Sequence, residues 1–414
     1  MFHPGNDFVR TGRSPKRRVS IKLAAMIEQL QRCLRDRAPM AISLLEKLVL
    51  ENSFTGNPRG GALVGEMLAA ELQSIPEMTD VRSIPSDRFA PHIVATNQPA
   101  QTDFIALVGH LDTVFPPGTF EGFRRDGGLL RGPGVLDMKG GLVVVLEALR
   151  ALSQVGVLRE IPVRLVIVSD EEVGSPEGRY VIERELAGAR AALVFEAGRA
   201  KDAVITSRRG TGSGRAVALG RAAHSGNAHA EGANAIRALC RFVEYAEALT
   251  DYASGMTVNV GVIRGGTSKN TVPDQAEALL DLRYVRLADG DALVSALEDA
   301  ARRAAIAGTT VTFTKELARP PLERSEGNVA LYREYAECAR DSGLGDDEAP
   351  LIGGGSDAAT TAAMGIMSID GLGPRGKGFH THAEFVEVET LVPKAEALAR
   401  FLMKNLRSTR EICG

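Results

Sequence analysis

The sequence predicts an α/β protein with a mostly parallel sheet, into which a smaller α+β domain is inserted. Short apolar runs such as residues 163–168 alternate with helical patterns, as is typical of strands buried on both faces of a parallel sheet. Between residues 207 and 317 the pattern changes to strand–helix–strand–strand–helix–strand, the split βαβ arrangement of a ferredoxin-like domain. We therefore expect residues 21–206 and 318–414 to form one domain and residues 207–317 another.

Length, charge and cysteine usage narrow the class of protein. A chain of 414 residues is too long for one ordinary core, which favours two domains. The net charge of −3 argues against a nucleic-acid-binding surface, and no apolar run is long enough for a membrane span. Residues 1–20 are basic and polar and predict a disordered tail rather than a secretory signal. The cysteines form no CxxC pair, which predicts free thiols in a reducing, cytoplasmic compartment: Cys33, Cys240, Cys338 and Cys413.

The elements of the larger domain follow from apolar spacing. Helical spacing runs from Ser20 to Glu51, and Pro39 is expected to divide it into two helices. Further helices are predicted over residues 59–74, 142–152, 180–186, 329–338 and 392–406. Strands are predicted around Val94 and over residues 104–108, 163–168, 191–195 and 367–369.

The inserted domain has its own set of elements. Strands are predicted over residues 215–218, 257–263, 276–285 and 311–313. Helices are predicted over residues 233–249 and 292–307.

Polar side chains follow several of the predicted parallel strands. His110 follows the strand at 104–108, Glu196 follows 191–195, and three successive acids, residues 170–172, follow 163–168. Ligands in such sheets bind beyond the carboxyl ends of the strands. Three adjacent carboxylates repel one another unless positive charge lies among them, and a pair of metal ions is the simplest source of that charge. The ordinary alternative is a solvated acidic turn.

Two imidazoles and three carboxylates form the candidate ligand set for a divalent metal: His110, Asp137, Glu172, Glu196 and His380. Each has an alternative, because a histidine can be structural, Asp137 can be a helix N-cap and Glu196 can be a surface acid. Their shared position favours the metal site. Asp137 is the candidate to bridge two metals, since it precedes a predicted helix beside the site. Asp112 can accept a hydrogen bond from the far ring nitrogen of His110 and fix its tautomer.

Five segments, in this order and spacing, resemble the dinuclear-zinc aminoacylase and carboxypeptidase family of metallopeptidases. They are GHLDTV, RGPGVLDMKGG, SDEEVGS, VFEAG and FHTHAEF. The branch of bacterial glutamate carboxypeptidases (carboxypeptidase G) is the most similar, because GPG before the bridging Asp and GGGSDAA fit it. The resemblance covers roughly residues 40–405. It implies a phosphorylase/hydrolase-like zinc exopeptidase domain carrying an inserted ferredoxin-like lid and dimerisation domain.

The resemblance also implies how two metal ions are held. His110, Asp137 and Glu196 would bind the first metal ion, and Asp137, Glu172 and His380 the second. The ions would be Zn²⁺, with Co²⁺ or Mn²⁺ as alternatives. Glu171 would be the general base that activates the attacking water. His382 is the neighbouring alternative to His380, but His380 and Glu384 match the family spacing of His, three residues, Glu.

In the inserted domain, Ala223-His224-Ser225-Gly226 resembles a family motif whose histidine reaches across a dimer interface. His224 would then stabilise the tetrahedral oxyanion, and the protein would be a homodimer through this domain. The alternatives are a turn histidine at this position and His229 as the acting residue.

Asn270 and Arg283 match family positions that bind the carboxylate of the substrate. A surface ion pair is the ordinary alternative for Arg283. Period-2 alternation is expected to put Arg283 and Asp281 on one face of their strand. A glycine-rich turn could bind the same carboxylate through backbone amides: Gly354, Gly355 and Ser356.

Together these features predict a metal-dependent hydrolase that cleaves an amide or peptide bond next to a free carboxylate, releasing a C-terminal amino acid such as glutamate. The substrate would be a small peptide or an N-acyl amino acid. Two alternatives remain open from the sequence. One is an N-acyl amino acid deacylase of the same family, and the other is a non-catalytic metal-binding regulator on the same scaffold.

Overall fold

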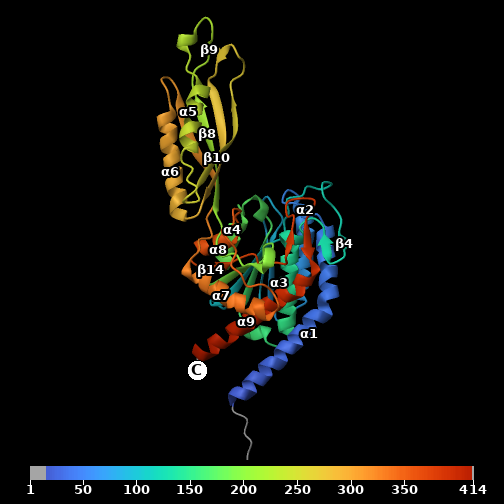
Figure 1. Ribbon diagram of the computed structural model, residues 1–414. Helices are drawn as coiled ribbons and strands as arrows, with labels where there is room; N and C mark the ends of the chain where they lie inside the picture. The colour runs from blue at the N-terminus through green and yellow to red at the C-terminus, as the bar shows by residue number, and fades with distance from the viewer. Residues whose placement is uncertain (1–14, 413–414) are drawn as a thin grey trace, which may run out of the picture.

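The computed structural model describes residues 15–412, and the larger part of the chain is built on a six-stranded sheet of order β1-β2-β6-β3-β7-β14 (Figure 1). The strands β6, β3, β7 and β14 are parallel, whereas β1 and β2 pair antiparallel. The predicted mostly parallel sheet is therefore confirmed. The strand bounds are β1 Asp80–Ile84, β2 His92–Thr96, β3 Phe104–His110, β6 Val163–Val168, β7 Ala189–Val194 and β14 Met367–Ile369.

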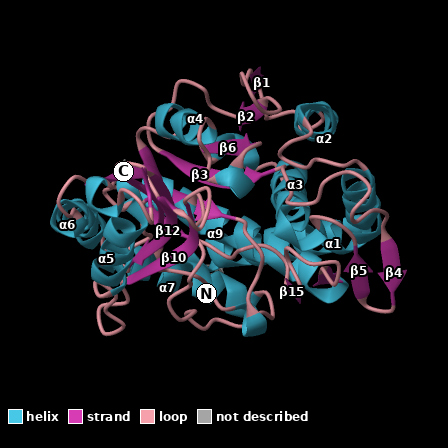
Figure 2. Cartoon of the chain, turned by 90° about the horizontal axis from the view of Figure 1, so that it is seen from above, coloured by secondary structure: helices cyan, strands magenta, loops and turns pink. Residues whose placement is uncertain are grey.

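Helices cover both faces of this sheet, which explains why its central strands are almost continuously apolar. All seven residues of β3 are buried. In Figure 2, α4 lies on one side of the sheet and α3 and α9 on the other. The helix bounds are α1 Pro15–Leu50, α2 Pro58–Gln73, α3 Gly140–Gln154, α4 Gly178–Glu185, α7 Glu326–Asp341, α8 Ala358–Ala363 and α9 Leu391–Ile412.

The first helix corrects two predictions. Pro39 lies inside the continuous helix α1 and does not divide it. Proline removes one helical hydrogen bond, but the apolar stripe of α1 continues past it, with Leu34 and Leu45 buried in the same core. Packing against α3 and α9 therefore outweighs the local preference. The helix also begins at Pro15, so residues 15–20 are helical rather than disordered, and residues 1–14 lie outside the described part.

The second sheet occupies residues 210–319 and has the order β10-β12-β8-β13. All its pairings are antiparallel, and with two helices on one face it has the topology of a ferredoxin-like fold. Burial alternates strictly along β12, which puts Arg283 and Asp281 on the face away from the helices, as predicted. The bounds are β8 Gly210–Leu219, α5 Ala235–Glu247, β10 Thr257–Gly265, β12 Gln275–Tyr284, α6 Leu287–Ala304 and β13 Thr310–Arg319.

Two smaller sheets complete the fold. A two-stranded pair, β9 Ala223–His224 with β11 Thr271–Val272, lies at the end of the second sheet that is farthest from the larger part of the chain (Figure 1). The other sheet has the order β15-β16-β5-β4. Its bounds are β4 Arg124–Asp126, β5 Leu129–Arg131, β15 Gly376–Lys377 and β16 Phe385–Glu387.

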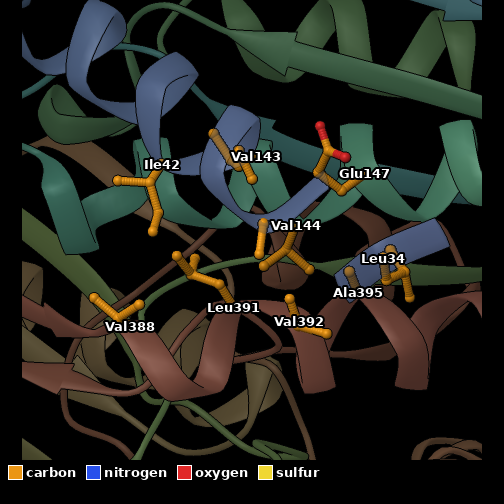
Figure 3. A pocket seen from close by; sticks show the side chains of 11 residues that line it. Leu34, Ile42, Val143, Val144, Glu147, Val388, Leu391, Val392 and Ala395 are labelled. Atoms are coloured by element: carbon orange, nitrogen blue, oxygen red, sulfur yellow. The ribbon is translucent and has the colours of Figure 1, made fainter. Parts of the chain in front are cut away.

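An apolar crevice lies where α1, α3 and α9 meet (Figure 3). Its volume of about 30 Å³ leaves room for little more than water. Glu147 is the one acidic residue in its lining, and its carboxylate forms ion pairs with Arg37 at 2.6 Å and with Arg150 at 2.9 Å. The crevice is therefore too small to enclose a substrate-sized ligand.

Two predictions from composition concern the whole chain. Cys33, Cys240 and Cys338 are free thiols as predicted, and Cys413 lies outside the described residues. Within residues 15–412, no helix combines the length and the apolar character that crossing a bilayer requires.

Candidate metal centre

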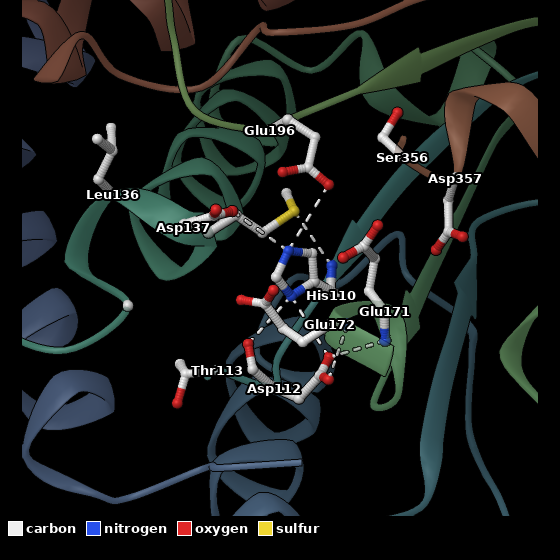
Figure 4. Close-up of polar contacts among 12 residues, drawn as sticks. His110, Asp112, Thr113, Leu136, Asp137, Glu171, Glu172, Glu196, Ser356 and Asp357 are labelled. Atoms are coloured by element: carbon white, nitrogen blue, oxygen red, sulfur yellow. Dashed lines mark hydrogen bonds and ion pairs between the residues drawn. The ribbon is translucent and has the colours of Figure 1, made fainter. Parts of the chain in front are cut away.

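The candidate site lies at the carboxyl ends of the parallel strands, where the sequence predicts it (Figure 4). His110 is the last residue of β3, Glu171 and Glu172 follow β6, and Glu196 follows β7. Asp137 lies in the turn Val135–Lys139 that precedes α3. His380 comes from the loop after β15 and has a positive φ of 62°. The fold thus brings together five predicted ligands that are up to 270 positions apart.

Asp137 lies between two sets of donor atoms. Its Oδ1 is 3.4 Å from Nε2 of His110, which is itself 3.6 Å from Oε1 of Glu196. Its Oδ2 is 3.4 Å from Nε2 of His380, which is 3.1 Å from Oε2 of Glu172. Each carboxylate oxygen of Asp137 therefore faces one imidazole–carboxylate pair.

Two orphaned atoms show that this donor set fits a metal ion. Nε2 of His110 and Oδ1 of Asp137 are buried and have no hydrogen-bond partner among the described residues. Buried polar atoms are normally satisfied, and imidazole nitrogen with carboxylate oxygen is the donor set of borderline divalent metals. Glu171 is a geometric rival as a ligand, because donor atoms of His110, Glu171 and Glu196 lie within 4.8 Å of one another.

The electrostatics of these acidic and imidazole side chains also favour the binding of a cation. Burial raises the pKa of Glu172 to about 7 and that of Glu196 well above its usual range. His380 donates hydrogen bonds to the carboxylates of Asp137 and Glu172, and these bonds raise its pKa to about 10. Burial alone would lower the pKa of His110, but neighbouring carboxylates, led by Glu196, raise it well above its ordinary value. Cations bound among these groups would stabilise the ionised carboxylates.

Asp112 contacts the far ring nitrogen of His110 as predicted, and it supports the site in a second way as well. Nδ1 of His110 lies 3.0 Å from the main-chain oxygen of Asp112 and 3.4 Å from its carboxylate, so the main-chain oxygen is the closer acceptor. This arrangement leaves Nε2 free for a metal ion. The Asp112 carboxylate also accepts bonds from the amides of Glu171 and Glu172 and from the Thr55 hydroxyl. It therefore holds the backbone that carries the two candidate glutamates, Glu171 and Glu172.

Asp137 is not a helix N-cap, which removes the structural alternative for this residue. Helix α3 has no side-chain cap, and Asp137 lies before it in a non-helical conformation. The peptide bond between Asp137 and Met138 is cis. The turn is fixed by the buried carboxylate of Glu384, which accepts bonds from the amides of Gly134, Leu136 and Asp137 at 2.8–3.1 Å.

The three successive acids after β6 diverge, which is how the chain avoids their mutual repulsion. Asp170 is buried and accepts bonds from the amides of Glu177 and Gly178 at the start of α4, so its role is structural. Glu172 faces His380, whereas Glu171 points to another partner. The prediction of positive charge near these acids therefore applies to the last two of them.

The partner of Glu171 is Arg319, which the sequence analysis missed. Arg319 is the last residue of β13, and its buried guanidinium forms a short ion pair with the Glu171 carboxylate. It also donates to the main-chain oxygen of Glu171 at 3.0 Å and to the Ser175 hydroxyl at 3.1 Å. Residues 171 and 319 are 148 positions apart, and no local pattern marks the pairing. The end of the second sheet is thereby attached to the candidate site.

Comparison with known proteins decides the family. Residues 106–404 match the model of peptidase family M20/M25/M40. The chain belongs to this family. The predicted resemblance is confirmed, and the protein is a metal-dependent hydrolase of the M20/M25/M40 type.

Individual relatives cover most of the chain. It is 31% identical to carboxypeptidase G2 of Pseudomonas sp. (strain RS-16) over 375 residues, which cover 89% of this chain and 90% of that protein. It is 29% identical to acetylornithine deacetylase of Myxococcus xanthus over 320 residues, covering 72% of this chain and 78% of the relative. Its fold is similar to that of a tripeptidase from Staphylococcus aureus, with a TM-score of 0.75, 23% identity and coverage of 89% and 99%.

The two candidate histidines of this M20/M25/M40 chain lie in different surroundings. The His380 ring faces Asp137 and Glu172. The His382 ring stacks on Phe120, with ring centroids 5.2 Å apart. This packing favours His380 as the ligand.

The predicted residues of the inserted segment do not all lie together. His224 and Asn270 are neighbours at the far end of the second sheet, where Ser225 donates to the main-chain oxygen of Asn270 (Figure 1). Arg283 lies at the opposite end of this sheet, in register through Thr211 with Arg319. It pairs with Asp281 at 2.8 Å, which is the predicted alternative for this residue.

The glycine-rich turn is held by a buried ion pair. Arg208 pairs with Asp370 at 2.6 Å and donates to the carbonyls of Gly354 and Gly355. The Ser356 hydroxyl donates to Asp370, so this side chain is used in the fold. A role of the turn in substrate binding would therefore fall to its backbone amides.

Proposed function

We propose that this protein is a dinuclear metallohydrolase that cleaves an amide or peptide bond next to a free carboxylate. The observation that carries the proposal is the position of Asp137, whose two oxygens each face a separate imidazole–carboxylate pair. His110, Asp137 and Glu196 would hold one ion, and Asp137, Glu172 and His380 the other. Zn²⁺ is the expected ion for this donor set, with Co²⁺ or Mn²⁺ as alternatives.

The chemistry is divided between the ions and the chain. The bound cations would supply Lewis acidity and lower the pKa of water toward about 7. Glu171 takes the proton that the water releases as its oxygen attacks the amide carbon. The C–N bond then breaks, and Glu171 passes this proton to the leaving nitrogen. Arg319 and the Asp112 carboxylate keep Glu171 in place through the contacts already described.

His224 is the proposed donor to the oxyanion. Its Nδ1 accepts bonds from the amides of Gly226 and Asn227, both at 3.1 Å, so the ring proton is assigned to Nε2. An exposed Nε2–H donor suits an oxyanion. Because His224 lies at the far end of its sheet, it would reach the metal centre of a second subunit, in a homodimer formed through the inserted domain of residues 207–317.

The substrate proposed is a small peptide or N-acyl amino acid with a free C-terminal carboxylate, and the product a C-terminal amino acid such as glutamate. The similarity to carboxypeptidase G2 supports this choice. Asn270, Arg283 and the amides of the turn at residues 354–356 are the proposed carboxylate contacts. A cytoplasmic location remains a prediction from the scattered free cysteines.

The second candidate function is an N-acyl amino acid deacylase, which the similarity to acetylornithine deacetylase favours. The two functions differ in whether the acyl group or the released amino acid decides specificity. A non-catalytic regulator is disfavoured because Glu171 and the complete donor set are present.

The test is a hydrolysis screen of the metal-reconstituted protein against N-acyl amino acids and dipeptides, read out as release of the amino acid. We expect the fastest turnover on substrates that end in glutamate, with activity maintained when the acyl group is changed. Glu171→Gln should abolish turnover while both ions stay bound. Turnover that depends on the acyl group and ignores the amino acid would favour the deacylase.

A further inference from the structure

Arg199 is a partly buried cation without an anionic partner. Its Nε is buried and has no hydrogen-bond partner, and no ion pair is recorded for it among residues 15–412. The guanidinium carbon instead lies 5.4 Å from the centroid of the Phe379 ring. Charged groups that leave water are normally paired, because desolvation of an isolated charge is costly. The free guanidinium therefore requires an explanation.

The position of Arg199 connects it to both halves of the metal centre. It follows Glu196 by three positions, in the loop after β7. The Phe379 ring that it faces packs edge-on against the His380 ring, with centroids 5.5 Å apart. Side chains of the loop after β15 are open to solvent, with Phe379 39% exposed and His380 49% exposed. One aromatic ring therefore separates the guanidinium from a candidate metal ligand, in a part of the site that solvent reaches.

The charge balance indicates the kind of ligand. The carboxylates that act on Arg199 have other partners, because Asp370 pairs with Arg208 while Glu196 and Asp137 are candidate metal ligands. Cations bound at His110 and His380 would add positive charge beside Arg199. An incoming anion would offset the repulsion between these cations and the guanidinium, and it would accept hydrogen bonds from the unpaired N–H groups of Arg199. The planar guanidinium fork matches a carboxylate with two parallel hydrogen bonds.

A neighbouring arginine indicates which end of the substrate is involved. After burial, Arg208 is the group that most lowers the pKa of Arg199, and Arg208 holds the turn at Gly354 and Gly355. Arg199 therefore lies within electrostatic range of the arginine that holds this turn. The proposed function assigns the C-terminal carboxylate of the leaving amino acid to the turn.

We propose that Arg199 is a specificity-determining residue that binds the side-chain carboxylate of the leaving amino acid, and so selects an acidic residue over a neutral one of the same shape. This inference rests on the proposed function for the orientation of the substrate. It requires only that the guanidinium, backed by Phe379, meets an anion that enters the metal centre.

The kinetic test compares N-benzoylglutamate with N-benzoylglutamine, which differ in side-chain charge. We expect Arg199→Gln to lower kcat/KM for the glutamate substrate about 10- to 100-fold, mainly through KM, because a charge-assisted paired hydrogen bond is lost. The same variant should change the glutamine substrate less than about 3-fold. Arg199→Lys should recover part of the loss. Arg190→Gln is the matched control, since Arg190 lies near the amino end of β7, and the metal centre lies beyond the carboxyl end of that strand. An equal loss on both substrates would overturn the assignment.

A binding test separates this inference from the proposed function. Calorimetry on the metal-loaded Glu171→Gln protein should give tighter binding of L-glutamate than of L-glutamine, and the further change Arg199→Gln should remove this preference. If the wild-type protein hydrolysed neither substrate, the proposed function would fail, and the calorimetric preference would still decide the role of Arg199. Equal binding of the two amino acids when Arg199 is present would refute it.

Discussion

The guanidinium of Arg319 is bonded to both the carboxylate and the main-chain oxygen of Glu171, so the last residue of β13 holds the proposed general base. Both side chains are buried. The strand that ends the second sheet therefore returns to the larger domain at the point where the proposed proton transfer occurs. Movement of this sheet would be transmitted to Glu171 through the Arg319 side chain.

The first prediction concerns this pair. Arg319→Lys keeps the charge, but one ammonium group cannot maintain the bonds to the carboxylate, the carbonyl and Ser175 together. We expect kcat to fall about 10- to 100-fold with the metal content unchanged. Arg319→Met should also lower the free energy of unfolding by about 3–5 kcal/mol, because it leaves a buried charge unpaired. Arg324→Lys is the control, because Arg324 is an exposed arginine that forms an ion pair with Glu348. Wild-type kcat in Arg319→Lys would contradict a positioning role.

The second prediction concerns the support of the bridging Asp137. Glu384→Gln replaces a carboxylate oxygen by an amide donor that would face the amides of Gly134, Leu136 or Asp137. We expect metal affinity to fall about 10- to 100-fold, since groups that orient a ligand contribute this much. Metal titration measures the change. Glu389→Gln, at an exposed ion pair, is the control and should bind metal as the wild type does.

The third prediction tests whether His224 acts in a second subunit. Homodimers of His224→Ala and of Glu171→Gln should each be inactive. Mixing the two by unfolding and refolding together should restore about a quarter of wild-type activity, because half of the dimers would be mixed and each would have one complete site of two. Light scattering checks that dimers form. No recovery in confirmed mixed dimers would exclude action in trans.

The fourth prediction concerns stability against pH. Lys394 is buried 3.6 Å from Asp202, and burial lowers its pKa to about 8 although Asp202 opposes the shift. The pKa of an unfolded lysine is about 10.4. Between these values the unfolded chain binds more protons than the native protein, so the free energy of unfolding rises with pH. Between pH 7.5 and 9.5 the wild type should gain about 2 kcal/mol relative to Lys394→Met.

Urea unfolding at both pH values measures this difference. Lys47→Met, at an exposed lysine, should follow the wild type. A parallel pH dependence in the wild type and Lys394→Met would show that Lys394 does not keep a depressed pKa.

The sequence predicts the fold and the clustering of ligands because both follow from local patterns. Parallel strands end at one edge, so His110, Glu172 and Glu196 had to lie near one another once their strands were recognised. The uninterrupted helix across Pro39 was missed because helix packing, which no local spacing reports, outweighs the proline.

Side-chain pairings between residues far apart in the chain could not be predicted from local sequence patterns either. Arg319 reaches Glu171 from the end of β13, and Arg208 reaches Asp370 over 162 positions. The role of Asp112 was only partly predicted. Its closeness to His110 in the sequence indicates the contact with the imidazole, but nothing in the sequence indicates that its carboxylate binds the amides of Glu171 and Glu172. Side-chain direction in loops depends on contacts that only the folded chain provides.

The central claim is that Asp137 bridges two cations, and anomalous diffraction from zinc-loaded crystals tests it most directly. Maps on the two sides of the zinc absorption edge should give two peaks, one against Oδ1 of Asp137 with His110 and Glu196, the other against Oδ2 with Glu172 and His380. A single peak, or peaks that leave Asp137 uncoordinated, would contradict the account.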